Sequence, residues 1–338
     1  MKSFRRFSIR KKAGLFAALA ALFALAAVLS ISLGAVWISP INVLKILSGA
    51  ERGTGQANII LLARLPRTCG CLLAGAALAV SGAVIQSVLS NPLAAPNVIG
   101  VNSGAGLAIA LFCALFPTKL SLMPLVAFAG ALFAVLLVLF IAEKTGASKM
   151  TLVLAGVAVS GIFSAVIDAV VTFVPEALNG YTDFKIGGLA GATMAKIAPA
   201  FWVIVLALAA ILLMSSELDV LALGAGTAQS LGLNVRRVRI AALVLSAALC
   251  GAAVSFAGLI GFVGLIVPHM MRTAFDGSSR DMAISCALGG SILVTLCDVL
   301  SRVLFAPFEL PVGSMLSCLG GPFFIWLLIV RKRGVSHG

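Results

Sequence analysis

The sequence predicts an all-α protein that spans a membrane about ten times, with both chain ends on the cytoplasmic side. Of the 338 residues, 61% are apolar and 10% are charged, whereas a soluble domain is about half apolar and about a quarter charged. Long charge-free stretches recur along the chain, and each crossing of a hydrocarbon core needs roughly 20 apolar residues. Basic residues gather at both chain ends, which is typical of cytoplasmic segments.

Charges and prolines delimit the first five predicted helices. A basic tail, residues 1–12, precedes an apolar run that is too long for the core of a signal peptide, about 7–15 residues, so we expect it to be retained as a span. The next charge-free stretch, between Arg67 and Lys119, is long enough for two spans, and its prolines break it because proline lacks a backbone donor. The five helices are predicted over 13–38, 60–90, 97–116, 120–142 and 150–173, with a short surface helix and loop around Lys45.

The second half of the chain is predicted to add five more helices. A polar interval over 175–196 precedes a helix over 197–215. The charge-free stretch 240–271 fits one long helix or two short ones. Two crossings that turn near Ala257-Gly258, followed by helices over 283–304 and 312–330, place both basic ends on one side. On this topology 16 of the 24 Lys and Arg residues are cytoplasmic, as the charge bias of membrane proteins favours.

A faint internal repeat links two of these helices. Six residues match six others at a constant offset of 176: Leu73, Gly75, Ala76, Ala77, Gly82 and Pro92 match Leu249, Gly251, Ala252, Ala253, Gly258 and Pro268. Because the two spans point in opposite directions, the match indicates an inverted duplication, which is common in transporters. Coincidence in a chain rich in Ala and Gly is the alternative.

Residues that could carry chemistry are few. With two histidines, His269 and His337, and no C-x-x-C pair among seven cysteines, the sequence predicts no metal site, no cofactor and no catalytic constellation. It contains no phosphate loop of the type G-x-x-x-x-G-K-[ST], so ATP is not bound by that route. The basic residues lie beside apolar spans and indicate topology. We therefore expect neither enzymatic activity nor a nucleic-acid partner.

Apart from Arg64 and Arg67 near the start of the span 60–90, the ionisable side chains inside the predicted spans are few: Asp168 toward the end of 150–173, and Asp298 with Arg302 in 283–304. Asp298 and Arg302 are four residues apart on one helix face, where opposite charges pair. We expect this structural pairing. A proton relay is the alternative, and it would make the chain a secondary transporter driven by protons or sodium.

Four ordered segments carry more information than the composition. They are Arg64-Leu65-Pro66-Arg67 with 75–86 and 91–96, then 221–232, then 261–269, and finally 309–313 with Gly321-Pro322-Phe323-Phe324. Together they resemble the FecCD-type permeases of ABC importers over about 58–333. The resemblance implies that residues 1–338 form a single transmembrane permease domain in a bacterial cytoplasmic membrane. It also implies a cargo of ferric siderophore, with haem or cobalamin as the alternative.

The resemblance further implies partners and the residues that meet them. The partners are cytoplasmic ABC ATPase subunits, a second permease subunit that is a copy or a paralogue, and an extracytoplasmic substrate-binding protein. Arg64, Arg67 and Arg302 would receive acidic residues of the binding protein, with snorkelling to the membrane interface as the alternative. The segment 217–236 would couple to the ATPase through Leu221, Ala222, Leu223, Gly224, Ala228, Leu231 and Gly232.

The pattern of this coupling segment predicts two short helices. One runs over 218–223 and ends at Gly224, and Thr227 would cap a second that ends at Gly232. Such an apolar helical hairpin would fit a groove on a partner. Two departures from the resemblance matter: Ala225 and Gly226 stand where acidic residues are usual, and 184–188 lacks the usual tryptophan. The sequence therefore leaves the cargo open among siderophore, haem and cobalamin.

Overall fold

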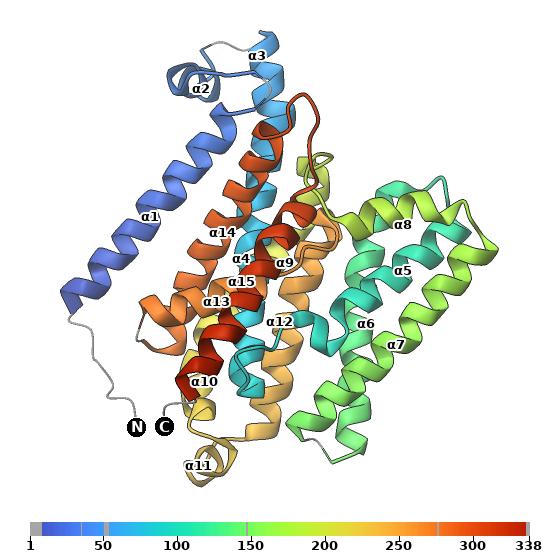
Figure 1. Ribbon diagram of the computed structural model, residues 1–338, viewed down its shortest axis with the longest axis vertical. Helices are drawn as coiled ribbons and strands as arrows, with labels where there is room; N and C mark the ends of the chain where they lie inside the picture. The colour runs from blue at the N-terminus through green and yellow to red at the C-terminus, as the bar shows by residue number, and fades with distance from the viewer. Residues whose placement is uncertain (1–8, 35, 51–53, 147, 276, 336–338) are drawn as a thin grey trace.

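The protein is helical throughout the part of the chain that the structure describes. The computed structural model describes residues 9–34, 36–50, 54–146, 148–275 and 277–335, and within these ranges it contains no strand (Figure 1). Most of the predicted N-terminal tail, the loop residues Glu51 and Arg52, and His337 lie outside the described residues.

Ten helices correspond to the ten predicted spans. They are α1 (Ile9–Ser32), α4 (Leu65–Leu89), α5 (Val101–Leu115), α6 (Met123–Lys144), α7 (Lys149–Phe173), α9 (Met194–Leu213), α12 (Val235–Ala257), α13 (Val263–Ala274), α14 (Ser279–Val303) and α15 (Val312–Val335). Shorter elements join them: α2 (Pro40–Leu47), α3 (Gly55–Asn58), the π-helix η1 (Ile59–Arg64), the 3-10 helices η2 (Pro96–Ile99) and η3 (Leu120–Leu122), α8 (Ala177–Ile186), α10 (Ser215–Ala222) and α11 (Ala225–Ser230). The predicted surface helix near Lys45 is confirmed as α2.

Seven of these helical segments are long and apolar enough to cross a membrane. α5 and the apolar part of α15 are shorter, and α13 has only 12 residues. At 1.5 Å per residue α13 spans about 18 Å, less than a hydrocarbon core of about 30 Å. The multi-span helical fold is therefore confirmed, while ten full crossings and cytoplasmic termini stay predictions.

The charge-free stretch 240–271 is two helices, as predicted. α12 ends at Ala257, and the next residue, Gly258, has a φ of +68°, a conformation that glycine adopts without steric cost. A Cβ at Gly258 would also lie 2.5 Å from the carbonyl oxygen of Phe184. The chain then reverses, and α13 begins at Val263.

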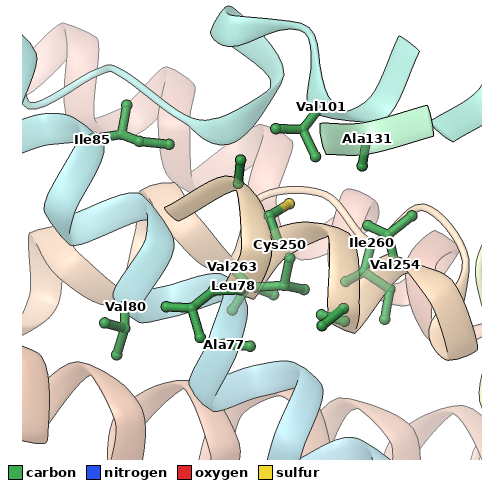
Figure 2. Packing of buried hydrophobic residues seen from close by; sticks show 14 of the residues in the cluster. Ala77, Leu78, Val80, Ile85, Val101, Ala131, Cys250, Val254, Ile260 and Val263 are labelled. Atoms are coloured by element: carbon green, nitrogen blue, oxygen red, sulfur yellow. The ribbon is translucent and has the colours of Figure 1, made fainter. Parts of the chain in front are cut away.

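α4 runs through the middle of the bundle and is almost entirely buried. Its small residues let the backbones of neighbouring helices approach closely. Close packing of this kind holds membrane helices together, because the hydrophobic effect does not favour contact between helices over contact with lipid. A Cβ added at Gly75 would overlap the carbonyl of Gly290 in α14, and one added at Gly82 would overlap Gly264 in α13. Figure 2 shows the apolar cluster around α4, with Leu78 among Cys250, Val254 and Val263.

The two ends of the bundle differ in chemistry. One end, at the bottom of Figure 1, carries the α6–α7 connection, α10, α11 and the start of α12. We call it the basic end, because Lys144, Lys149, Arg236, Arg237 and Arg239 lie there. The opposite end, called the far end, carries α2, α8 and the loop 304–311.

The suspected repeat receives mixed support from the arrangement. α4 and α12 pack against each other and run in opposite directions, as an inverted duplication requires. Yet the matched residues Gly82 and Gly258 differ, because Gly82 lies inside α4 and Gly258 lies in the break after α12. The repeat therefore does not correspond position by position in the fold.

Replacing Gly75 by Ala should destabilise the protein by about 1–3 kcal/mol, because the new methyl group would force α4 and α14 apart. Gly161→Ala in α7 is a matched control, since a Cβ there meets no atom within 4 Å. Thermal unfolding in detergent measures the difference. Equal unfolding midpoints for the two variants would show that the close approach of α4 and α14 contributes little.

Candidate functional site

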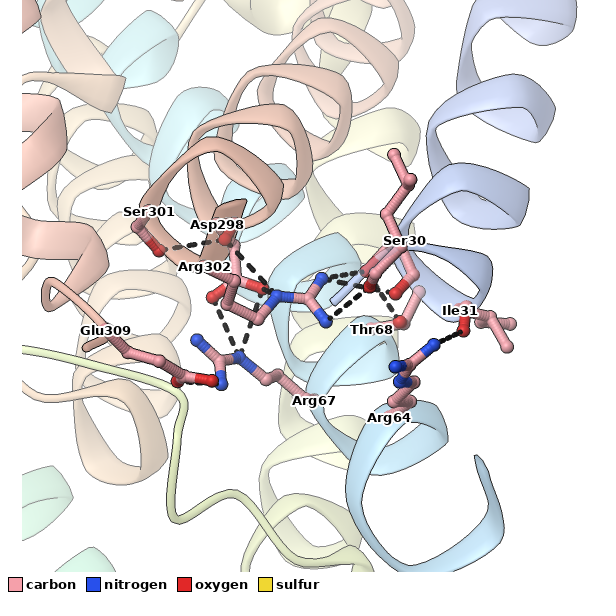
Figure 3. Close-up of polar contacts among 10 residues, drawn as sticks. Ser30, Ile31, Arg64, Arg67, Thr68, Asp298, Ser301, Arg302 and Glu309 are labelled. Atoms are coloured by element: carbon pink, nitrogen blue, oxygen red, sulfur yellow. Dashed lines mark hydrogen bonds and ion pairs between the residues drawn. The ribbon is translucent and has the colours of Figure 1, made fainter. Parts of the chain in front are cut away.

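Two groups of residues, one at each end of the bundle, carry the functional predictions. At the far end, Arg64, Arg67, Asp298, Arg302 and Glu309 form what we call the arginine cluster (Figure 3). At the basic end, α10 and α11 form the predicted coupling segment. The helix pair α4 and α14 extends from one group to the other.

Asp298 is the centre of the arginine cluster. Its side chain is 0% exposed. Arg67 Nε donates to Asp298 Oδ1 at 3.0 Å and to Oδ2 at 3.1 Å, while Arg302 Nε lies 3.2 Å from Oδ2. The predicted pairing of Asp298 with Arg302 is confirmed. The second arginine, from α4, was not predicted as its partner.

Arg302 and Arg64 also hold the end of α1. Arg302 Nη1 and Nη2 each donate at 3.2 Å, to the carbonyl oxygens of Leu33 and Ser30. Arg64 Nη1 donates at 2.8 Å to the carbonyls of Ile31 and Ser32. The last carbonyls of a helix have no partner within it and carry partial negative charge. Two guanidinium groups therefore cap α1 inside the protein.

The local backbone explains where these arginines point. Pro66 has no backbone N–H to continue the helix, and the preceding residues form the π-helix η1, in which the Leu65 N–H bonds the Ile60 carbonyl. A π-helical turn inside an α-helix is rare and often marks a functional site. Arg64 lies at the end of this turn and faces α1, whereas Arg67 lies in the first turn of α4 and faces Asp298 (Figure 3).

All three arginines predicted to dock the binding protein are buried and hold partners within the chain. Of the three, Arg67 is the arginine whose partner within the chain could most easily be replaced by an acidic side chain of another protein. Its Nη1 donates to Glu309 Oε2 at 2.6 Å, and the Glu309 side chain is 42% exposed on the loop 304–311. Docking at Arg64, Arg67 and Arg302 stays a prediction.

A cavity of about 530 Å³ opens beside the cluster. Its walls come from α4, α6, α8, the α8–α9 connection and the loop before α15, and its charged lining residues are Arg67, Asp183, Lys196 and Glu309. Ligand pockets commonly have volumes of about 300–1,000 Å³. The far end thus has a hollow of that size with charges of both signs at its wall.

The coupling segment folds into the two predicted short helices. α10 ends at Ala222, the chain turns at Gly224 with a φ of +105°, and α11 is followed by Gly232 with a φ of +83°. The prediction that Thr227 caps the second helix is wrong. Gly224 lets the chain restart a helix at once, so α11 begins at Ala225 and Thr227 lies inside it.

The leucines of this segment divide into two sets. Leu218 and Leu221 are buried in the bundle, where α10 packs against α4 and α14, and Ala228 is also buried. Leu223 and Leu231 are 62% and 63% exposed. This second set, together with exposed Ala222 and Ala225, presents apolar surface that a partner could cover.

A hydrogen bond ties α10 to the start of α14. Asp219 Oδ1 accepts from the backbone N–H of Ser279 at 2.7 Å. Because Asp298 lies on the same helix as Ser279, α14 connects the coupling segment directly to the arginine cluster. Sequence reasoning missed this bond, because no local pattern around Asp219 points to a partner 60 residues later in the chain.

Comparison with known proteins identifies relatives along nearly the whole chain. The model of the FecCD transport family matches residues 22–330. The Fe(3+) dicitrate transport system permease protein FecD of Escherichia coli is 36% identical, covering 91% of this chain and 95% of the relative. The hemin transport system permease protein HmuU of Yersinia pestis is 37% identical, covering 83% and 86%. The vitamin B12 import system permease protein BtuC of Salmonella paratyphi A is 36% identical, covering 98% and 100%.

A solved structure shares the fold. It is described as an inward-facing conformation of a metal-chelate type ABC transporter, and it superposes with a TM-score of 0.83 at 27% identity, covering 94% of this chain and 99% of the other.

Asp298→Ala should destabilise the protein by about 3–5 kcal/mol, because it leaves Arg67 and Arg302 buried without their shared carboxylate. The measurement is the unfolding free energy or midpoint in detergent. Asp168→Ala is the matched control: this carboxylate also lies in a long apolar helix but is exposed. If both variants unfold like the original chain, the buried pairs contribute no stability.

Proposed function

The chain belongs to the FecCD transport family and is a multi-span permease of an ABC importer, and we propose that its cargo is a ferric siderophore. The observation that carries this proposal is the match over 22–330 together with relatives whose names specify an iron chelate. The structural neighbour, of metal-chelate type, supports the same class of cargo.

Haem and cobalamin are the second candidates. The relatives named for hemin and for vitamin B12 are as similar to this chain as the one named for ferric dicitrate. Overall identity therefore does not separate the three cargo classes, and a transport experiment has to do so.

We propose a transport cycle in which the cargo enters at the far end and ATPase subunits drive the conformational change from the basic end. A substrate-binding protein outside the cell would deliver the chelate to the cavity beside the arginine cluster. ATPase subunits in the cytoplasm would contact the exposed Leu223 and Leu231. This coupling requires only that the ATPase binds one conformation of the permease more tightly in its ATP state.

The packing of α10 against α4 and α14 couples movements at the two ends of the bundle. A partner that displaces α10 also pulls on α4 and α14, because Leu218 and Leu221 are buried and Asp219 is bonded to Ser279. α14 is anchored at the far end by Asp298. We propose that the pair α4 and α14 moves as one unit, tilting in the cytoplasmic membrane and opening the pathway alternately to each side.

For the binding protein we propose that Arg67 is the docking arginine. Glu309 already occupies Arg67 Nη1 from an exposed loop, so an acidic side chain of a partner could replace it without disturbing Asp298. Arg64 and Arg302 would act through Arg67 by fixing the ends of α1 and α14.

Uptake of labelled cargo should identify the chelate. Iron-starved cells with and without the gene are offered a panel of ferric siderophores, haem and cobalamin. We expect uptake of one siderophore class to be lost in the deletion strain and restored by the intact gene. Unchanged siderophore uptake with lost haem or cobalamin uptake would contradict the siderophore assignment and leave the family intact.

Replacing both Leu223 and Leu231 by Ser should abolish ATP-driven uptake while leaving the permease folded, because both side chains are exposed. Met150→Ser, an exposed apolar residue at the same end but outside the coupling segment, should transport normally. Uptake and unfolding midpoints are measured together. Transport by the purified chain without ATPase subunits, abolished by Asp168→Asn, would instead indicate an ion-driven transporter.

Glu309→Gln should strengthen docking of the binding protein about two- to fivefold, since it removes a partly exposed competitor for Arg67. Binding is measured with the permease in lipid discs and the binding protein of the same system in solution. Glu176→Gln, at an exposed carboxylate near α8, is the control. Weaker or unchanged docking in Glu309→Gln would argue against Arg67 as the docking residue.

A further inference from the structure

A second cavity lies at the basic end, away from the arginine cluster. Its volume is about 550 Å³, and it lies between α6, α7, α12 and the α11–α12 connection. Leu139, Leu152 and Ile240 line it with apolar surface, and Arg236 and Arg239 line it with positive charge. A wall that is apolar on one side and cationic on the other matches an amphiphilic anion.

The charges around this cavity are strongly unbalanced. Arg237 lies between the two lining arginines in sequence, Lys144 follows the lining residue Glu143, and Lys149 is near enough to Arg239 for their charges to repel. Among the described residues that line it, the one carboxylate is Glu143, and Arg236 Nε already holds Glu143 Oε1 at 2.9 Å. The net field at the mouth is therefore positive, and an anion entering it meets one carboxylate that is already neutralised by an ion pair.

Exposed apolar residues continue from the cavity along α6 toward the middle of the bundle. Leu136 and Phe140 of α6, each three residues before a lining residue of the same helix (Leu139 and Glu143), are exposed. The Lys144 ammonium lies 6.0 Å from the centre of the Phe140 ring, as expected of a lysine at a membrane interface whose stem follows apolar surface. The cavity therefore lies next to exposed apolar surface of α6 that belongs to its apolar span.

We propose that this cavity binds the head group of an anionic phospholipid of the inner leaflet, with its acyl chains along α6. Basic pockets between membrane helices on the cytoplasmic side suit such head groups. The phosphate would lie between Arg236 and Arg239, and Leu139 and Leu152 would contact the glycerol and the first methylene groups. The cavity also borders Gln229 and Gly232, so the lipid would rest against the end of the coupling segment.

The apolar continuation favours a lipid over an acidic segment of a soluble partner. Leu136 and Phe140 lie within the apolar span of α6, where a cytoplasmic protein does not reach but acyl chains do. The site does not depend on the cargo, because it lies at the opposite end of the bundle from the cavity beside Arg67.

Native mass spectrometry of the full-length chain in detergent tests the proposal, with phosphatidylglycerol and phosphatidylcholine as probes. We expect the chain to retain phosphatidylglycerol in preference to phosphatidylcholine. Arg236→Gln combined with Arg239→Gln should weaken phosphatidylglycerol binding by on the order of tenfold, since each basic side chain contributes attraction to an anionic lipid. Arg239→Lys keeps the charge and should retain most of the binding.

The matched control neutralises Arg10 and Arg280, two exposed basic residues near the same end that do not line the cavity. This double variant should bind lipid normally, and unfolding midpoints establish that all variants are folded. Equal binding in the Arg236/Arg239 double variant, or equal loss in the control, would overturn the proposal. Saturation by inorganic phosphate without lipid retention, or loss of the lipid when ATPase subunits bind, would overturn it in favour of a free anion or a protein interface.

Discussion

The shared carboxylate of Asp298 is the interaction on which the far half of the molecule depends. A charge buried in a membrane protein is costly unless it is paired, and here one acid faces Arg67 from α4 and Arg302 from its own helix. The same two helices approach closely at Gly75 and Gly290. Steric fit and charge therefore fix one pair of helices, and α1, the loop 304–311 and the cavity beside Arg67 are arranged around that pair.

The same arrangement connects the two ends of the bundle mechanically. α10 packs on α4 and α14 through buried leucines and through Asp219, so the basic end is connected to the helices that carry the cluster. Small residues along α4 give helix contacts without long interlocking side chains. Such contacts permit a helix pair to tilt while its own interface is preserved.

Much of the fold could be predicted from the sequence, because charge-free length is a direct measure of a membrane span. The break after Ala257 and the two helices of the coupling segment were predicted from glycines and charge. α8 was missed because it lies in a polar interval without clear periodicity. The end of α1 was predicted at 38 but the helix ends at Ser32, and that error hid the free carbonyls that Arg64 and Arg302 bind. The pairing of Arg67 with Asp298 joins residues 231 positions apart in sequence, which no local pattern reports.

The way α1 is held has a consequence for biosynthesis. α1 receives its cap from Arg302 and a salt bridge to Lys12 from Asp281 at 2.8 Å, both from α14, roughly 270 residues later in the chain. At a translation rate of about 5–20 residues per second, those partners leave the ribosome tens of seconds after α1. Until then α1 can make its contacts with Arg64 but lacks those with α14, and its apolar surface suits the bilayer. Arg67 of α4 also waits for Asp298, which follows it by 231 residues, so final assembly of the cluster is a late event that follows insertion of α14.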